Sequence, residues 1–239
     1  MGGGAHVTPE IVTVVCLFIR GEYPYTPEYV TRLRDMACRY LVTSVRSARF
    51  VCLTDRPELF TRDTAMDIIH VGRLPARYAF WSKLLVFNPD YGFTGRMLWL
   101  DLDVLVVNDL GPIVDFPAPF AFAADMFAAT GDGPAQESRK DGRRYLPKYQ
   151  GSVMVWNAGE QADLFTDWDP RISEEFYTDQ DYYAARAPHA ARMPVAWFPR
   201  ISLVHPPWPA EAKVVLVKKP KNHVALERWP WFRQYWGAA

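Results

Sequence analysis

Short apolar runs alternate with helical or polar segments in the first half of the chain. Runs rich in β-branched and aromatic residues predict strands over Glu10–Ile19, Arg49–Asp55 and Met66–Val71. Residues Pro27–Val42 repeat apolar side chains at helical spacing, with a proline in the first turn, and predict a helix. A second helix is predicted over Tyr78–Phe87, where "NPDYG" ends it. This alternation is typical of an α/β domain built on a parallel sheet.

The second half of the chain is less regular. Between two expected strands, residues 131–149 are polar, Gly-rich and basic, and predict a mobile loop. The expected strands are Pro119–Asp125, Gln150–Gly159 and, followed by a turn, Lys213–His223. The expected helices are Asp179–Ala187 and the aromatic segment Glu227–Trp236.

One apolar run contains two aspartates. Residues Arg96–Leu110, "RMLWLDLDVLVVNDL", read as a buried strand, in which Asp101 and Asp103 would point to the same face. Burying either carboxylate without compensation costs several kcal/mol. The pair can share a proton, meet basic side chains, or face a bound cation at a strand end.

Composition narrows the classes of protein. The 239 residues fit one medium domain, with room for a small appended subdomain. Basic and acidic residues both number 27, with no long basic run, which argues against a partner such as a nucleic acid. Three cysteines, an odd number, predict reduced core thiols in a cytoplasmic protein. No apolar run reaches the length of a membrane span, and residues 1–10 lack a signal-peptide pattern and predict a flexible lead-in.

The Asp-x-Asp pattern is weak evidence alone. It occurs three times, at 101/103, 167/169 and 179/181, and only the first ends an apolar strand. Mg²⁺ and Mn²⁺ prefer carboxylate oxygens and often share a substrate's phosphates, so Asp101 and Asp103 predict a divalent-cation site. The plain alternative is a pair of turn or helix-capping aspartates.

Several segments, taken in order, resemble the GT-A-fold glycosyltransferases, with the likeness closest to their glycogenin-like, retaining branch. "MLWLDLDVLVVNDL" resembles the metal-binding strand, "IRGEYPYTPEYVTRLRDM" the first donor-binding loop and helix, and "FVCLTD" the second strand. "WSKLLVFNP" resembles the lysine-bearing helix, "GSVMVWNAG" the acceptor-side strand, and "TDQDYY" the Asp-Gln motif. The resemblance runs from about Val12 to Trp236.

The resemblance implies a GT-A fold: a Rossmann-like, mostly parallel central sheet with flanking helices. It implies one domain over residues 1–239, with a nucleotide-sugar-binding half at 11–125 and an acceptor-side half at 126–239. The implied reaction moves a sugar from a nucleotide diphosphate, expected to be UDP, to an acceptor hydroxyl with retention of configuration. The acceptor would be a glycan, a lipid-linked molecule or a protein.

The resemblance also assigns residues on the donor side. Asp101 and Asp103 would hold Mn²⁺ or Mg²⁺ across the two phosphates. Lys83 would pair with a phosphate or stabilise its developing charge, unless it is a surface lysine. Asp55 would hold the base or ribose, unless it is a turn residue. The loop over the nucleotide would be formed by Arg20, Gly21 and Tyr25, unless it is an ordinary exposed loop.

On the acceptor side, the resemblance places Asp179, Gln180 and Asp181 at the reacting sugar. Gln180 cannot act as a base, so its expected role is orienting or electrostatic. Asp179 or Asp181 would take the acceptor's proton or hold donor hydroxyls; the alternative is a helix N-terminus with favourable acids. Asp125 is a further candidate for contact with the donor sugar.

One departure from the pattern concerns the third metal ligand. "KVVLVKKPKNH" resembles a closing segment that reads His-Gly-x-Pro-Lys-Pro-His in relatives, and the alignment places Val217 at the first histidine. Valine cannot bind metal. Three alternatives remain: two aspartates suffice with substrate and water, His223 or His205 substitutes, or Lys218 supplies positive charge.

Two other functions compete with sugar transfer. A sugar-nucleotide nucleotidyltransferase would need a Gly-rich, basic loop after the first strand, which "CLFIRGEYPYT" does not provide. A non-catalytic domain that binds a nucleotide sugar or a glycan would not need the metal-binding histidine that Val217 replaces. The C-terminal aromatic residues predict core packing or, alternatively, a peripheral membrane contact or an acceptor platform: Trp229, Trp231, Phe232, Tyr235 and Trp236.

Overall fold

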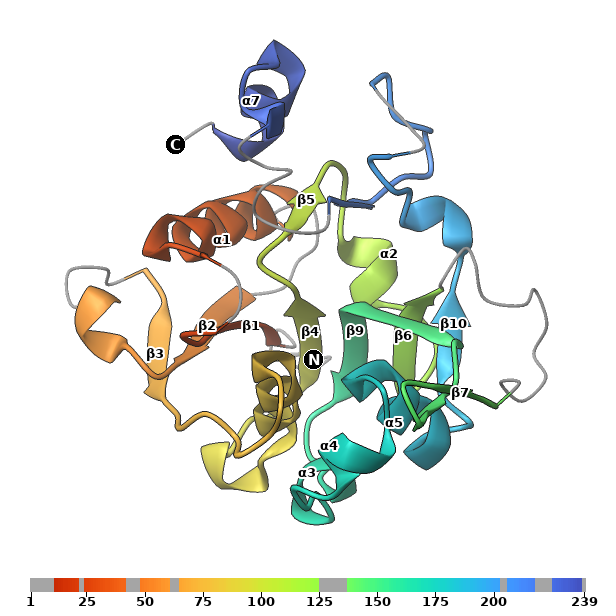
Figure 1. Cartoon of the computed structure of the whole chain (residues 1–239). Coiled ribbons are helices and arrows are strands. Elements are labelled where there is room, and N and C mark those ends of the chain that lie inside the picture. Colours follow the sequence, from red (N-terminus) through yellow and green to blue (C-terminus); the bar gives the residue numbers. More distant parts are fainter. Residues whose placement is uncertain are drawn as a thin grey trace, which may run out of the picture.

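The computed structural model has a central seven-stranded sheet (Figure 1). It describes residues 11–21, 24–41, 48–60, 65–124, 137–202, 206–217 and 225–237. The strands lie in the order β10 (Ala191–Met193), β6 (Phe120–Ala124), β9 (Tyr149–Asn157), β4 (Arg96–Leu100), β1 (Val12–Phe18), β2 (Ala48–Thr54) and β3 (Asp67–His70).

The sheet is mostly parallel, as the sequence predicts. Strands β4, β1, β2 and β3 run parallel to one another, and β10 runs parallel to β6. Only β9 among these strands runs antiparallel to its neighbours, β4 and β6. The carboxyl ends of β1 and β4 and the amino-terminal part of β9 therefore meet at one edge of the sheet.

Helices cover both faces of the sheet. Successive side chains of each buried strand point to opposite faces, so both faces present apolar residues that the helices cover. Val14 and Cys16 pack in the same cluster as the buried side chains of α1 (Pro27–Leu41) and α7 (Pro230–Trp236). Val15 packs with η2 (Ala79–Phe87) and α5 (Asp179–Arg186) on the other face. Shorter helices within the described residues are η1 (Pro57–Phe60), η3 (Pro89–Tyr91), α2 (Gly111–Val114), α3 (Asp163–Thr166), α4 (Ile172–Glu175) and η4 (Val195–Trp197).

The aspartate-bearing run is not one continuous strand, which corrects the sequence prediction. Strand β4 ends at Leu100, the chain turns through residues 101–103, and β5 (Val104–Val106) pairs antiparallel with β11 (Val214–Leu216) in a separate two-stranded sheet. The backbone N–H of Asp101 still donates to Ser152 on β9, at 2.9 Å. The polar pair thus lies where the strand leaves the buried sheet, and no charge is forced into the middle of a strand.

The predicted mobile loop over 131–149 contains a β-hairpin, which is a second correction. Strands β7 (Ser138–Lys140) and β8 (Arg143–Tyr145) pair antiparallel across a two-residue turn. Asp141 and Gly142 both have positive φ, 50° and 77°, as a type I′ hairpin turn requires. The Asp-Gly pair in "RKDGRR" is a strong hairpin signal that the polar composition concealed.

The cysteines depart partly from the prediction of core thiols. Cys16 and Cys52 are buried directly opposite each other on β1 and β2, whereas Cys38 is exposed on α1. All three are free thiols. Within the described ranges, no helix is both long and apolar enough to cross a bilayer.

Candidate active site

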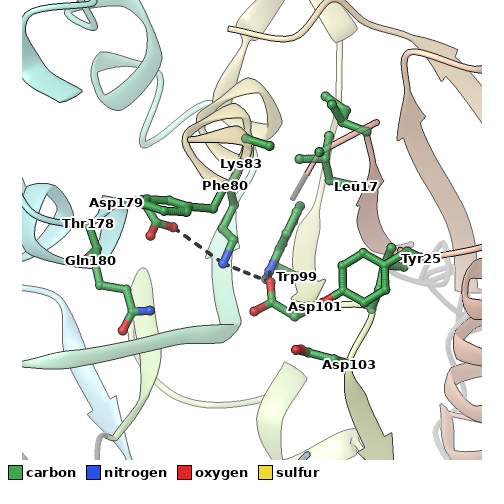
Figure 2. A pocket seen from close by; sticks show the side chains of 14 residues that line it. Leu17, Tyr25, Phe80, Lys83, Trp99, Asp101, Asp103, Thr178, Asp179 and Gln180 are labelled. Carbon is green, nitrogen blue, oxygen red and sulfur yellow. Dashed lines mark hydrogen bonds and ion pairs between the residues drawn. The ribbon is translucent and has the colours of Figure 1, made fainter. Parts of the chain in front are cut away.

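A cavity of about 370 Å³ opens at the edge where β1 and β4 end. Its walls come from the end of β1 and the loop after it, the end of β4 and the turn after it, η2, and the start of α5 (Figure 2). Its lining comprises Leu17, Ile19, Gly21, Tyr25, Ala79, Phe80, Lys83, Trp99, Asp101, Leu102, Asp103, Thr178, Asp179 and Gln180. The cavity therefore gathers predicted donor-side and acceptor-side residues from four separate parts of the sequence.

Lys83 lies at the centre of the charged groups. Its ammonium is 2.9 Å from Asp101 Oδ1 and 3.5 Å from Asp179 Oδ2, and it donates to the carbonyl of Gly151 at 2.9 Å (Figure 2). It also lies 5.4 Å from the ring centroid of Trp99. Lys83 is only 7% exposed, so it is not the surface lysine that the plain reading of the sequence allowed.

The neighbouring charges determine the protonation state of this lysine. Burial by itself lowers the pKa of Lys83, but the attraction of Asp101 and Asp179 outweighs it, so that the pKa lies above its ordinary value. Lys83 is therefore a buried ammonium that partly neutralises two carboxylates.

Asp179 is buried and lacks a full set of partners. Burial, the largest effect, raises its pKa to about 6, while Lys83 opposes the shift and Asp101 adds to it. Its Oδ2 atom has no hydrogen-bond partner among the described residues, although it forms the ion pair with Lys83. A buried carboxylate oxygen that accepts no hydrogen bond is an atom to which a bound hydroxyl can donate.

Asp179 and Asp181, which the sequence analysis grouped together, have different surroundings at the start of α5. Asp181 accepts hydrogen bonds from the backbone N–H of Leu146 at 2.6 Å, and from the backbone N–H and hydroxyl of Thr178 at 2.8 and 2.6 Å. Thr178 and Asp181 form a capping box, and Asp181 does not line the cavity. Asp179 and Gln180, the two residues before Asp181, do line the cavity.

Asp101 and Asp103 line the same wall of the cavity. Asp101 Oδ1 accepts a hydrogen bond from the indole Nε1 of Trp99 at 2.9 Å in addition to its pairing with Lys83. The carbonyl of Asp103 accepts from the backbone N–H of Val217 at 3.3 Å. The end of β11, where the alignment expects a histidine ligand, is thus directly beside Asp103.

The remaining donor-side candidates divide into two pairs. Gly21 and Tyr25 line the cavity, whereas Arg20 and Asp55 do not. Asp55 instead accepts a hydrogen bond from the backbone N–H of Arg20 at 3.1 Å, so it fixes the start of the loop that carries Gly21.

Four of the candidate residues lie outside the described residues: Lys218, His223, Asp125 and the alternative ligand His205. Sequence reasoning also missed two groups at the site. Trp99 could have been found, because it lies two residues before Asp101 in the predicted strand; the backbone carbonyl of Gly151 carries no such signal.

The donor set fits a hard divalent cation that shares its coordination with a substrate. Mg²⁺ in particular is commonly bound by one or two carboxylates together with substrate phosphates and water. Asp101 and Asp103 supply two carboxylates on one cavity wall. Among the described residues, no three acidic, histidine or cysteine side chains are grouped closely enough to hold a metal without further ligands.

Comparisons with known proteins identify the fold. No protein family and no curated protein matches the sequence. The galactosyltransferase LgtC, solved with donor and acceptor sugar analogues, superposes with a TM-score of 0.62 at 16% identity over 95% of each chain. An active-site mutant of LgtC gives 0.61 at 16% identity, over 87% of this chain and 88% of that one.

A third similar structure is the bifunctional glycosyltransferase WbbM without ligands. It superposes with a TM-score of 0.55 at 14% identity, over 98% of this chain and 52% of WbbM. These likenesses, together with the mostly parallel sheet and its flanking helices, establish the GT-A fold that the sequence motifs predict.

Proposed function

We propose that the protein is a glycosyltransferase that moves a sugar from a nucleotide-diphosphate sugar, expected to be UDP-linked, to an acceptor hydroxyl. The observation that carries the proposal is one cavity that gathers Lys83, Asp101, Asp103 and Asp179 in a fold shared with sugar transferases. The cavity also has apolar walls, among them Leu17 and Phe80. A cavity that combines apolar walls with a few converging charges suits a nucleotide sugar.

The reaction breaks the bond between the anomeric carbon and the diphosphate oxygen, and forms a bond from that carbon to the acceptor oxygen. The proton of the acceptor hydroxyl passes to an oxygen of the departing nucleoside diphosphate, which leaves with the bonding electrons. A divalent cation on Asp101 and Asp103 would supply charge neutralisation for the diphosphate. Lys83 stabilises the negative charge that develops on the leaving oxygen.

Lys83 is suited to this role because its side chain is already fixed. Three contacts, with Asp101, Asp179 and the carbonyl of Gly151, hold the ammonium in place before any ligand arrives. A preorganised cation in a partly dry cavity stabilises developing charge more strongly than one in water.

Asp179 and Gln180 act on the sugar. The Oδ2 atom of Asp179 accepts a hydrogen bond from a donor hydroxyl, which satisfies the buried oxygen. Gln180 lines the cavity one residue further on and orients the reacting sugar through its amide. Asp181 is left out of the catalytic set, since its oxygens cap α5.

The experiment that tests the proposal is a donor-turnover assay. UDP-, GDP-, CDP- and dTDP-sugars are incubated with the protein, with Mn²⁺ or with EDTA, and with water or a panel of simple sugars as the acceptor. Release of nucleoside diphosphate is followed. We expect one donor class to turn over with Mn²⁺ and to slow at least a hundredfold in Lys83→Met. The control Asp90→Asn removes an exposed carboxylate that does not line the cavity, and should leave turnover unchanged.

The same assay separates the proposal from a non-catalytic nucleotide-sugar-binding domain. That alternative is favoured by Val217, which stands where the alignment expects a histidine. Tight binding of a nucleotide with no release from any donor would support the binding domain. Release of product with Mn²⁺ would exclude it.

A further inference from the structure

The β7–β8 hairpin carries different chemistry on its two faces. Residues directly opposite in an antiparallel pair share a face, so Lys140 and its partner Arg143 point the same way, and Arg144 points the opposite way. The guanidinium of Arg144 pairs with Glu137 at 2.8 Å and Glu175 at 2.9 Å. The charge on that face is therefore balanced by carboxylates.

The cations on the other face lie against aromatic rings. The ammonium of Lys140 is 4.4 Å from the ring centroid of Tyr177, and the guanidinium carbon of Arg143 is 4.8 Å from the same ring. Arg143 also lies 5.8 Å from the ring of Tyr78, over which the exposed Arg77 sits at 5.2 Å. Contact with an aromatic face attracts a cation but leaves its charge uncompensated.

Nearby acids do little to balance these cations. Asp141 is 3.9 Å from Arg143, and its side chain is 72% exposed, so the attraction is weak. Asp181 attracts Lys140, but its oxygens already accept hydrogen bonds from Leu146 and Thr178. Among the described residues, the cations on this face therefore outnumber the acids beside them.

Arg143 provides a second observation that favours an anionic ligand. It is only 5% exposed, yet its Nε atom has no hydrogen-bond partner among the described residues. Its Nη1 atom donates to the carbonyl of Tyr177 at 3.3 Å, a long hydrogen bond. Buried donors in native proteins are nearly always satisfied, so a guanidinium in this state suits an anionic ligand.

The basic cluster of Arg77, Lys140 and Arg143, with the rings of Tyr78 and Tyr177, adjoins the active-site cavity. Tyr177 immediately precedes Thr178, which lines the cavity, and the ring of Tyr78 stacks on that of Phe80, another lining residue, at 5.4 Å. Figure 2 shows Thr178 and Gln180 on the opposite side of Lys83 from Tyr25. The cluster thus continues from the side of the cavity that the proposed function gives to the sugar.

We propose that Arg77, Lys140 and Arg143 form an acceptor subsite that binds an anionic group, phosphate or carboxylate, on a sugar. The inference rests on the proposed function, since it names the acceptor class of that site. Arginine and lysine recognise such oxyanions through charge-assisted hydrogen bonds. The rings of Tyr78 and Tyr177 hold these cations in place beside the cavity.

The test is direct binding, without turnover. Glucose 6-phosphate, glucuronate and neutral methyl glucoside are titrated by saturation-transfer NMR in the presence of saturating UDP and Mg²⁺, which occupy the donor cavity. We expect at least one anionic sugar to bind at least tenfold more tightly than methyl glucoside, and to weaken in 0.5 M NaCl. The anionic sugar that binds identifies phosphate or carboxylate as the group.

Variants assign the binding to the cluster. The double variant Arg77→Gln/Lys140→Gln changes two exposed side chains and should bring the anionic sugars to the affinity of methyl glucoside. The control Arg139→Gln removes one charge from the opposite face of the same hairpin and should keep the preference. Equal binding of charged and neutral sugars by the unmodified protein would overturn the inference, as would equal effects of the two variants.

The experiments can contradict the acceptor subsite and the transferase function independently of each other. UDP binding and donor turnover with no preference for anionic sugars would overturn the subsite and leave the transferase standing. Anionic binding that depends on Lys140, in a protein that binds no nucleotide, would contradict the proposed function.

Discussion

Lys83 is the residue on which the charge balance of the cavity depends. It is a buried cation between two carboxylates, one of which, Asp179, is 3% exposed. Removing one partner of a buried ion pair leaves the other charge uncompensated, which costs more than the pair itself contributes. The arrangement therefore makes a prediction about stability as well as activity.

Lys83→Met should lower the free energy of unfolding by about 3 kcal/mol at pH 7, because it leaves the buried Asp179 carboxylate without its cation. The double variant Lys83→Met/Asp179→Asn should recover at least about 1 kcal/mol of that loss, since neither buried charge remains. Urea unfolding of the four proteins of this cycle measures the coupling. Strictly additive effects would show that the two side chains do not interact.

Asp179 predicts a specific dependence of stability on pH. Its pKa rises from an ordinary 3.8 to about 6 in the folded state, chiefly because of burial. The folded protein therefore holds a proton that the unfolded chain gives up, and this contribution is present below pH 3.8 and lost as pH rises through about 6.

Relative to Asp179→Asn, the unmodified protein should lose on the order of 3 kcal/mol of unfolding free energy between pH 4 and pH 7. Urea unfolding in EDTA across this range measures the difference without a competing cation. A difference that stays constant with pH would mean that Asp179 titrates like an exposed aspartate.

At the scale of elements, the cavity depends on close contact between the loop after β1 and η2. A Cβ atom on Gly21 would lie 2.6 Å from Cβ of Ala79, closer than two carbons can approach. Glycine at this position therefore lets the loop lie against the helix that carries Lys83. The sequence-based argument gave Gly21 to the nucleotide; the structure shows a packing reason as well.

Gly21→Ala should lower the free energy of unfolding by about 1–3 kcal/mol, because the loop and η2 must move apart. The matched control is Gly72→Ala, where a Cβ meets nothing within 4 Å and stability should stay the same or rise slightly. Thermal unfolding of both variants checks this. If Gly21→Ala is as stable as the control, the contact does not constrain the loop.

The elements with strong periodicity were predictable from sequence. The apolar runs of β1, β2 and β6 and the helical spacing of α1 match the structure within a few residues. The continuous strand over Arg96–Leu110 was wrong, because apolar residues on both sides of a turn hide the turn. The hairpin at Ser138–Tyr145 was missed because its few residues are mostly polar.

At the scale of the whole molecule, the site is assembled by the sheet. β1 and β4 end at the same edge because they run parallel, and antiparallel β9 brings Gly151 to it. Sequence motifs named most of the polar lining but could not rank Asp179 above Asp181, because helix capping and cavity lining have the same local pattern. The hydrogen bonds that Asp181 accepts from Leu146 and Thr178, and the position of Asp179 in the cavity lining, distinguish the two residues.

The measurement that tests the central claim most directly is calorimetric titration of UDP, GDP and CDP, each with and without Mn²⁺. It is carried out on the unmodified protein and on Asp103→Asn. We expect one nucleotide to bind only with Mn²⁺, and its affinity to fall at least tenfold in the variant while the fold is retained. No binding of any nucleotide, or metal-independent binding that the variant leaves unchanged, would contradict a nucleotide-sugar site built on Asp101 and Asp103.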